Sequence, residues 1–111
     1  MHDLQKLTGL LGMARRAGRL SLGFDAALTA VNDRESDLLL TAADASAKTE
    51  KECRFTADKH GAAVAKLPLD KAALSAAVGA RKPVAVLAVC DEGFARAICS
   101  YISNCKEENS L

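Results

Sequence analysis

The sequence predicts an α/β protein, a three-layer α/β/α sandwich formed by one domain over residues 1–111. The chain is long enough for a single core. Half of its residues are apolar and 26% are charged, the balance of an ordinary globular protein. Short apolar runs alternate with segments of helical periodicity, an order typical of a sheet covered by helices on both faces.

The N-terminal third is expected to form a helix, a strand and a second helix. The first helix is indicated by an apolar stripe at helical spacing, namely Leu4, Leu7, Leu11 and Ala14. Asp3 suits the cap at its start and Gly18 the position just past its end. Residues 20–22 favour a short strand, and Gly23 opens the second helix. The residues expected to pack from that helix are Ala26, Ala27, Ala30 and Val31.

The rest of the chain is expected to alternate strand and helix. The expected strands are residues 38–43, 62–67 and 84–90. The first and last are continuous apolar runs, typical of strands covered on both faces. The expected helices run from Asp44 or Ser46 to His60, from Asp70 to Gly79, and from Asp91 to about Ser103. The polar tail, residues 104–111, is expected to be frayed.

The sequence lacks the motifs of common enzymes, so we expect a protein that is not an enzyme. No GxSxG, GxxxxGK[ST] or HExxH pattern is present. Asp91 and Glu92 are adjacent, and adjacent helical residues do not face one another. The cysteines are Cys53, Cys90, Cys99 and Cys105. They include no CxxC pair, so we expect reduced thiols in the core, and neither a metal site nor a cofactor.

The location of the protein is predicted from two further features. No apolar run approaches the roughly 20 residues that a membrane helix needs. The N-terminus also lacks the basic and then apolar order of a signal peptide. We therefore expect a cytoplasmic protein with no membrane partner.

Charge is distributed unevenly along the chain, although the net charge is only +1. Residues 1–24 and 61–82, here called the two basic segments, each carry a net charge of +3, whereas residues 25–44 carry −4. Brought together by the fold, the basic segments would form a modest phosphate-attracting surface; kept apart, they would be two solvated patches. Phe55 and Phe94 lie in helical patterns and are expected in the core, whereas Phe24 is expected to face solvent at a helix start.

Residues 10–20, Leu-Leu-Gly-Met-Ala-Arg-Arg-Ala-Gly-Arg-Leu, resemble the bacterial branch of the kink-turn-binding ribosomal protein family, the L-seven-Ae and L-thirty-e superfamily. Residues 23–31, 38–46 and 84–95 agree with it in order and spacing, so the resemblance extends from about Leu4 to Tyr101. It implies a mixed four-stranded sheet. It also implies binding of structured RNA, a kink-turn or related internal loop often on ribosomal RNA, with ribosomal or translation-associated proteins as further partners.

The resemblance also implies where RNA would bind. In such relatives the start of the second helix enters the RNA bend, and the loop before the last strand covers the protruding bases. A helix start offers unpaired amides and a positive dipole end, and glycine lets a backbone approach closely. The residues that the resemblance assigns to RNA binding are Arg15, Arg16, Arg19, Gly23, Phe24, Asp25, Arg81, Lys82, Pro83 and Val84.

The chain departs from the family pattern at the start of the second helix. Kink-turn binders carry Asn, Glu and Lys where this chain has Asp25, Ala26 and Thr29. An ionised Asp25 accepts hydrogen bonds and opposes phosphate, so its dipole contact with its own helix is favoured over an RNA contact. Two hypotheses remain. The chain is a ribosome-associated RNA-binding protein that recognises shape and charge, or a protein-interaction module that has lost kink-turn recognition.

Overall fold

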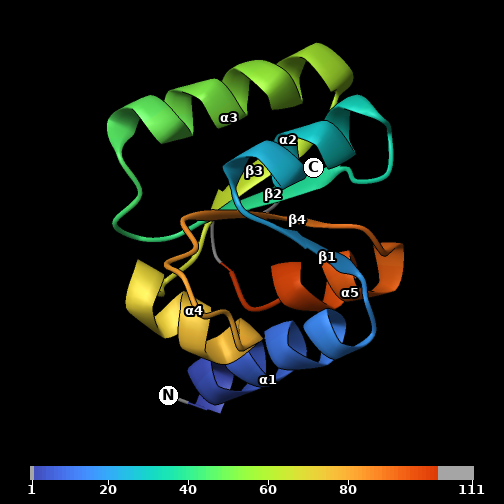
Figure 1. Cartoon of the computed structure of the whole chain (residues 1–111). Helices are drawn as coiled ribbons and strands as arrows, with labels where there is room; N and C mark the ends of the chain where they lie inside the picture. The colour runs from blue at the N-terminus through green and yellow to red at the C-terminus, as the bar shows by residue number, and fades with distance from the viewer. Residues whose placement is uncertain (1, 103–111) are drawn as a thin grey trace.

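Helices and strands alternate along residues 2–102, the part of the chain that the computed structural model describes (Figure 1). In chain order they are α1 (His2–Arg16), β1 (Leu20–Leu22), α2 (Phe24–Asn32), β2 (Leu38–Thr41), α3 (Ala47–His60), β3 (Ala63–Lys66), α4 (Lys71–Val78), β4 (Val86–Val89) and α5 (Glu92–Cys99). Helices α2 and α3 cover one face of the sheet, and α1, α4 and α5 cover the other. The predicted α/β/α sandwich is confirmed.

The four strands form one mixed sheet, as the resemblance implied, and their order is β1-β4-β2-β3. Strand β4 is antiparallel to both β1 and β2, whereas β2 and β3 are parallel. The register pairs Leu22 with Leu87, and Thr41 with both Val86 and Lys66. The last residues of β1, β2 and β3 therefore lie together, next to the starts of α2, α3 and α4. We call this the helix-start end of the sheet.

The central strands are buried on both faces, as their apolar runs predicted. All four residues of β2 and of β4 are buried. Because side chains alternate along a strand, Leu38 and Leu40 join the core formed with α1, α4 and α5. Leu39 joins the other core, which contains Val31 and Cys53.

Local signals set most of the element boundaries. Side-chain oxygens of Ser46, Asp70 and Asp91 accept hydrogen bonds from backbone amides in the first turns of α3, α4 and α5. Asp44, the alternative cap for α3, instead accepts a 2.8 Å hydrogen bond from the Lys71 amide at the start of α4. Gly61 adopts the left-handed conformation at the end of α3.

Several expected boundaries are wrong by a few residues. Helix α1 already includes Asp3, which therefore lies within the first turn rather than at the cap. Strand β4 begins at Val86 because the preceding segment, 80–85, forms a loop. Helix α5 ends at Cys99, followed by a turn, and Ser103 with the predicted frayed tail lies outside the described residues.

Some core assignments are also wrong. Phe55 is 70% exposed, because Cys53 and Ala57 set the buried side of α3 and a residue midway between them points outward. Leu4 is 41% exposed, although Leu7, Leu11 and Ala14 of the same stripe are buried. Ala26 is exposed, whereas Phe94 packs partly buried against the core as predicted.

The cysteines differ in their state. Cys53 and Cys90 carry free thiols, as predicted. Cys99 is disulfide-bonded, so the prediction of a reduced thiol is wrong at this position. Sequence spacing tests for closely paired metal ligands, whereas a disulfide depends on the distance between two cysteines in space.

Candidate nucleic-acid interface

A groove of about 570 Å³ opens at the helix-start end of the sheet. It is lined by residues from three parts of the chain, namely Arg15, Leu22, Gly23, Gly79, Ala80, Arg81, Lys82, Pro83 and Val84. Arg15 belongs to the first basic segment, and Arg81 and Lys82 belong to the second. The fold therefore brings the ends of the two basic segments together, the condition for a shared phosphate-attracting surface.

Close packing between α1 and α4 brings these segments together. Gly12 is buried in α1, and a Cβ added there would lie 3.2 Å from the carbonyl oxygen of Ala77 in α4. A larger residue would therefore push the two helices apart. In the middle of α4, the buried Ser75 hydroxyl accepts a 2.8 Å hydrogen bond from the Val84 amide. That bond fixes the loop of Arg81 and Lys82 against α4.

The start of α2 forms another wall of the groove. The Gly23 amide donates a 2.9 Å hydrogen bond to the carbonyl of Val86, which ties the turn to β4. Gly23 has φ 97° and ψ 159°, a backbone conformation essentially restricted to glycine. No heavy atom lies within 4 Å of a Cβ built there, so the space beside the turn is open.

Helix α2 also differs from α3, α4 and α5 in its capping. Those three helices begin with a side chain that accepts an amide hydrogen bond, whereas α2 has no side-chain cap. Its first amides and the positive end of its dipole therefore remain available to an anionic ligand. Asp25 is exposed in this first turn and places a negative charge beside them.

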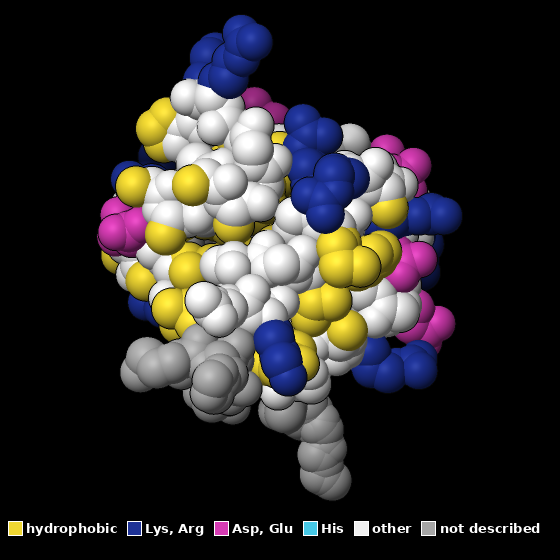
Figure 2. All heavy atoms as spheres, turned by 90° about the horizontal axis from the view of Figure 1, so that it is seen from below, with side chains coloured by type: hydrophobic (Ala, Val, Ile, Leu, Met, Phe, Trp, Pro, Cys, Tyr) yellow, Lys and Arg dark blue, Asp and Glu magenta, His cyan; other side chains and the backbone are white. Residues whose placement is uncertain are grey.

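The cations of the groove form no ion pairs within residues 2–102. They are Arg15, Arg81 and Lys82, and all three are exposed. Leu22, Pro83 and Val84 contribute an apolar wall to the same groove. In Figure 2, which views the face of α1, α4 and α5, acidic side chains lie mainly toward the rim while basic ones also occur near the middle.

Six of the ten residues expected to bind RNA line the groove, and four do not. The six are Arg15, Gly23, Arg81, Lys82, Pro83 and Val84. Arg19 lies at the opposite end of β1, where its Nε is 4.0 Å from Asp91 Oδ1. Arg16 and Asp25 are exposed outside the groove lining.

Phe24 is half-buried rather than solvent-facing, because it packs on the core beneath α2 and α3. Its exposed part lines a notch with Lys48, Thr49 and Glu52 at the start of α3. Sequence reasoning missed Leu22, Gly79 and Ala80 as groove residues. Their position next to predicted site residues was the only signal available.

Other kinds of site receive no support from the described residues. No three His, Cys, Asp or Glu side chains among them are placed to hold a metal ion. Within the same residues, no helix combines the length and the apolar character needed to cross a bilayer.

Comparisons with known proteins agree with this architecture. Residues 5–99 match a family model described as the ribosomal protein L7Ae/L30e/S12e/Gadd45 family. A protein of unknown function from Bacillus halodurans has a similar structure, with a TM-score of 0.82 and 27% identity over 89% of this chain and 98% of that chain. A Giardia lamblia 15.5kD RNA binding protein has a TM-score of 0.74 and 18% identity, over 91% of this chain and 85% of that chain. A search of curated proteins finds no match.

Proposed function

The chain belongs to the ribosomal protein L7Ae/L30e/S12e/Gadd45 family, and we propose that it is a non-catalytic protein that binds structured RNA through the groove beside Gly23. One observation carries the proposal. The two basic segments, far apart in sequence, meet around the one helix start among α2–α5 that has no side-chain cap. The Giardia lamblia 15.5kD RNA binding protein, which shares this fold, is consistent with the proposal.

The chemistry of the groove suits a folded polynucleotide. Exposed arginine and lysine side chains neutralise phosphates and release counterions, the term that dominates nucleic-acid affinity. The first amides of α2 add hydrogen-bond donors to a phosphate oxygen. The apolar wall of Leu22, Pro83 and Val84 offers a surface on which a base extruded from a bent strand can lie.

Recognition by this groove depends on shape and charge more than on base edges. Asp25 lacks the amide donors that Asn supplies in kink-turn binders, Ala26 lacks the carboxylate of Glu, and Thr29 lacks the positive charge of Lys. The proposed ligand is therefore a sharply bent or internally looped RNA, with ribosomal RNA as the leading source. A cytoplasmic, ribosome-associated role follows from that ligand.

The test is fluorescence anisotropy with a kink-turn, an internal-loop fragment of ribosomal RNA and a straight duplex of equal length. We expect the bent RNAs to bind more tightly than the duplex, with an affinity that falls steeply with salt. Equal binding of all three would contradict shape recognition, and no binding at low salt would overturn the proposal. Arg19→Ala is a control that should bind these RNAs as the parent does, because Arg19 lies at the other end of β1, away from the groove.

A second measurement separates this function from that of a protein-interaction module. The chain is used as bait in cell extract, with and without nuclease. Co-sedimentation with ribosomal subunits that nuclease abolishes supports the RNA function. A protein partner retained after nuclease, and lost on substitution of the notch residue Phe24, favours the interaction module.

A further inference from the structure

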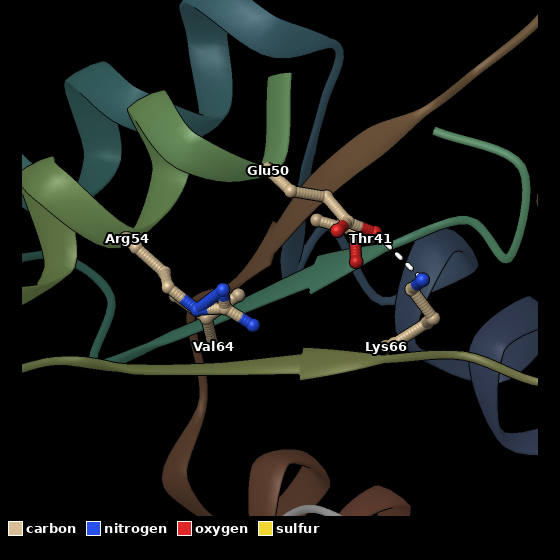
Figure 3. A pocket seen from close by; sticks show the side chains of 5 residues that line it. All are labelled: Thr41, Glu50, Arg54, Val64 and Lys66. Atoms are coloured by element: carbon tan, nitrogen blue, oxygen red, sulfur yellow. Dashed lines mark ion pairs between the residues drawn. The ribbon is translucent and has the colours of Figure 1, made fainter. Parts of the chain in front are cut away.

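A second depression, of about 310 Å³, lies between α3 and the edge strand β3. It is lined by Thr41, Glu50, Arg54, Val64 and Lys66 (Figure 3). We call it the α3–β3 pocket. None of these side chains lines the groove beside Gly23. The pocket is also at the opposite edge of the sheet, because β3 and β1 are the two edge strands.

The sheet register and the helix repeat place these side chains together. Thr41 pairs with Lys66, and Val64 precedes Lys66 by two residues, so the three share the face of the sheet beneath α3. Glu50 and Arg54 are four residues apart in α3 and lie on one side of that helix. Figure 3 shows Glu50 reaching toward Lys66 while Arg54 lies over Val64.

The charges of the pocket do not cancel. Oε2 of Glu50 is shielded from solvent and lies 3.0 Å from Lys66 Nζ, so these two groups compensate one another. Arg54 forms no ion pair with any carboxylate in the described part of the chain. One uncompensated guanidinium therefore stands at the pocket, beside the apolar Val64 and the side chain of Thr41.

We propose that the α3–β3 pocket binds a small molecule through a single oxyanion group, a carboxylate or a phosphate. The planar guanidinium of Arg54 can donate two parallel hydrogen bonds to such a group. With Lys66 already compensated by Glu50, the pocket balances one negative charge rather than a polyanion. Its volume of about 310 Å³ is at the lower end of the range of small-molecule sites, which suits a metabolite-sized ligand.

The experiment is an NMR titration of the full ¹⁵N-labelled chain with sodium phosphate and with sodium acetate. Sodium chloride at equal ionic strength is the reference. We expect saturable shifts of the Thr41, Val64 and Lys66 amides with phosphate or acetate, and not with chloride. Saturable shifts with only one of the two probes would identify that oxyanion as the group bound. Saturable shifts with both would show that the pocket accepts either a carboxylate or a phosphate. Equal shifts with chloride would show that the anions act only through ionic strength, and would overturn the proposed site.

Two variants of α3 decide whether Arg54 carries the interaction. Arg54→Gln should weaken binding about tenfold or more, since it removes the charged fork. Lys59→Gln removes the same charge from an exposed position of α3 outside the pocket lining, and should bind as the parent does. An equal loss in both variants, or no loss in Arg54→Gln, would contradict the proposal. Because Arg54 is exposed, both variants should keep the parent's melting temperature.

An RNA phosphate is the other source of an oxyanion at this end of the sheet, and the same variants test it. Arg54→Gln should leave RNA affinity unchanged in the anisotropy assay. If the small anions fail to bind and Arg54→Gln weakens RNA binding, the pocket belongs to the RNA surface and the small-molecule proposal is wrong. The anion titration needs no RNA, so its failure is distinguishable from failure of the proposed RNA function.

Discussion

The groove beside Gly23 and the α3–β3 pocket lie at the same end of the sheet but differ in how their charges are balanced. The groove gathers Arg15, Arg81 and Lys82 with no acidic partner among the described residues. In the pocket, Glu50 compensates Lys66, whereas Arg54 forms no ion pair within residues 2–102. The two sites thus differ in uncompensated charge, which is why we propose a polyanion for the groove and a single anionic group for the pocket.

Removing the groove cations gives the largest expected effect. The triple variant Arg15→Gln, Arg81→Gln and Lys82→Gln should lower RNA affinity about 100-fold at low salt, and reduce the slope of log affinity against log salt by about two or three. Anisotropy over a salt series measures both quantities. Acetate and phosphate binding at the α3–β3 pocket should persist in this variant. An unchanged salt slope would contradict the assignment of phosphate contacts to the groove.

The glycine that opens α2 gives the next effect. Gly23→Ala should destabilise the protein by about 1–3 kcal/mol, because its backbone conformation is strained for any residue with a Cβ. The built Cβ meets no atom within 4 Å, so the cost comes from the backbone rather than from a clash. Denaturant unfolding measures the free energy.

Gly9→Ala is the control for that substitution. Gly9 is exposed within α1, also has open space around its Cβ, and lies in a helix. Alanine there should stabilise the protein by about 0.5–1 kcal/mol. Equal effects of the two substitutions would show that the turn at Gly23 imposes no strain.

Local chemistry explains what could be predicted from the sequence. The caps Ser46 and Asp70 and the helix-ending Gly61 act over a few residues, so their helices were predicted closely. The mixed character of the sheet came from the family resemblance, and the strand order was not predicted, because periodicity does not reveal which strands pair.

Contacts between distant segments explain what could not be predicted. Arg15 lines the groove because α1 packs closely on α4, where Gly12 approaches Ala77. Arg19 does not line it, because β1 runs away from Arg19 toward the groove and leaves Arg19 at its opposite end. The α3–β3 pocket could not be predicted from the sequence for the same reason. Glu50 and Lys66 are 16 residues apart and meet only once α3 packs over β3.

Neutralising Glu50 sharpens the comparison by making the pocket more like the groove. Glu50→Gln frees Lys66 from its counter-charge, so acetate or phosphate affinity should rise a few-fold, by roughly 0.5–1 kcal/mol. The cost to stability should stay below about 1 kcal/mol, since the Lys66 side chain is 48% exposed and water screens the pair. The NMR titration provides the affinity and denaturant unfolding the stability. Weaker anion binding would mean that Glu50 orients the cations rather than cancelling one.

The smallest expected effect concerns the pKa of Cys53, a buried thiol of α3 that feels the negative charge of Glu50 from the other side. The pKa of the Cys53 thiol is raised from 9.0 to about 11, mainly by burial and to a smaller extent by the negative charges of Glu52 and then Glu50. The folded thiol therefore stays protonated at pH values where the unfolded thiol ionises. Its contribution to stability is complete below about pH 9 and is lost as the pH rises toward 11.

A ¹³C NMR titration that follows the Cβ shift of labelled Cys53 over this pH range measures its pKa in the folded protein, in a Cys90→Ser background. Glu52→Gln should lower that pKa more than Glu50→Gln, because Glu52 is the larger of the two charge effects. Lys59→Gln, which leaves both carboxylates in place, controls for a general change in net charge. If neither Glu variant moves the titration curve, desolvation alone raises the pKa of the thiol, and Glu50 acts only outward, toward Lys66 and the pocket.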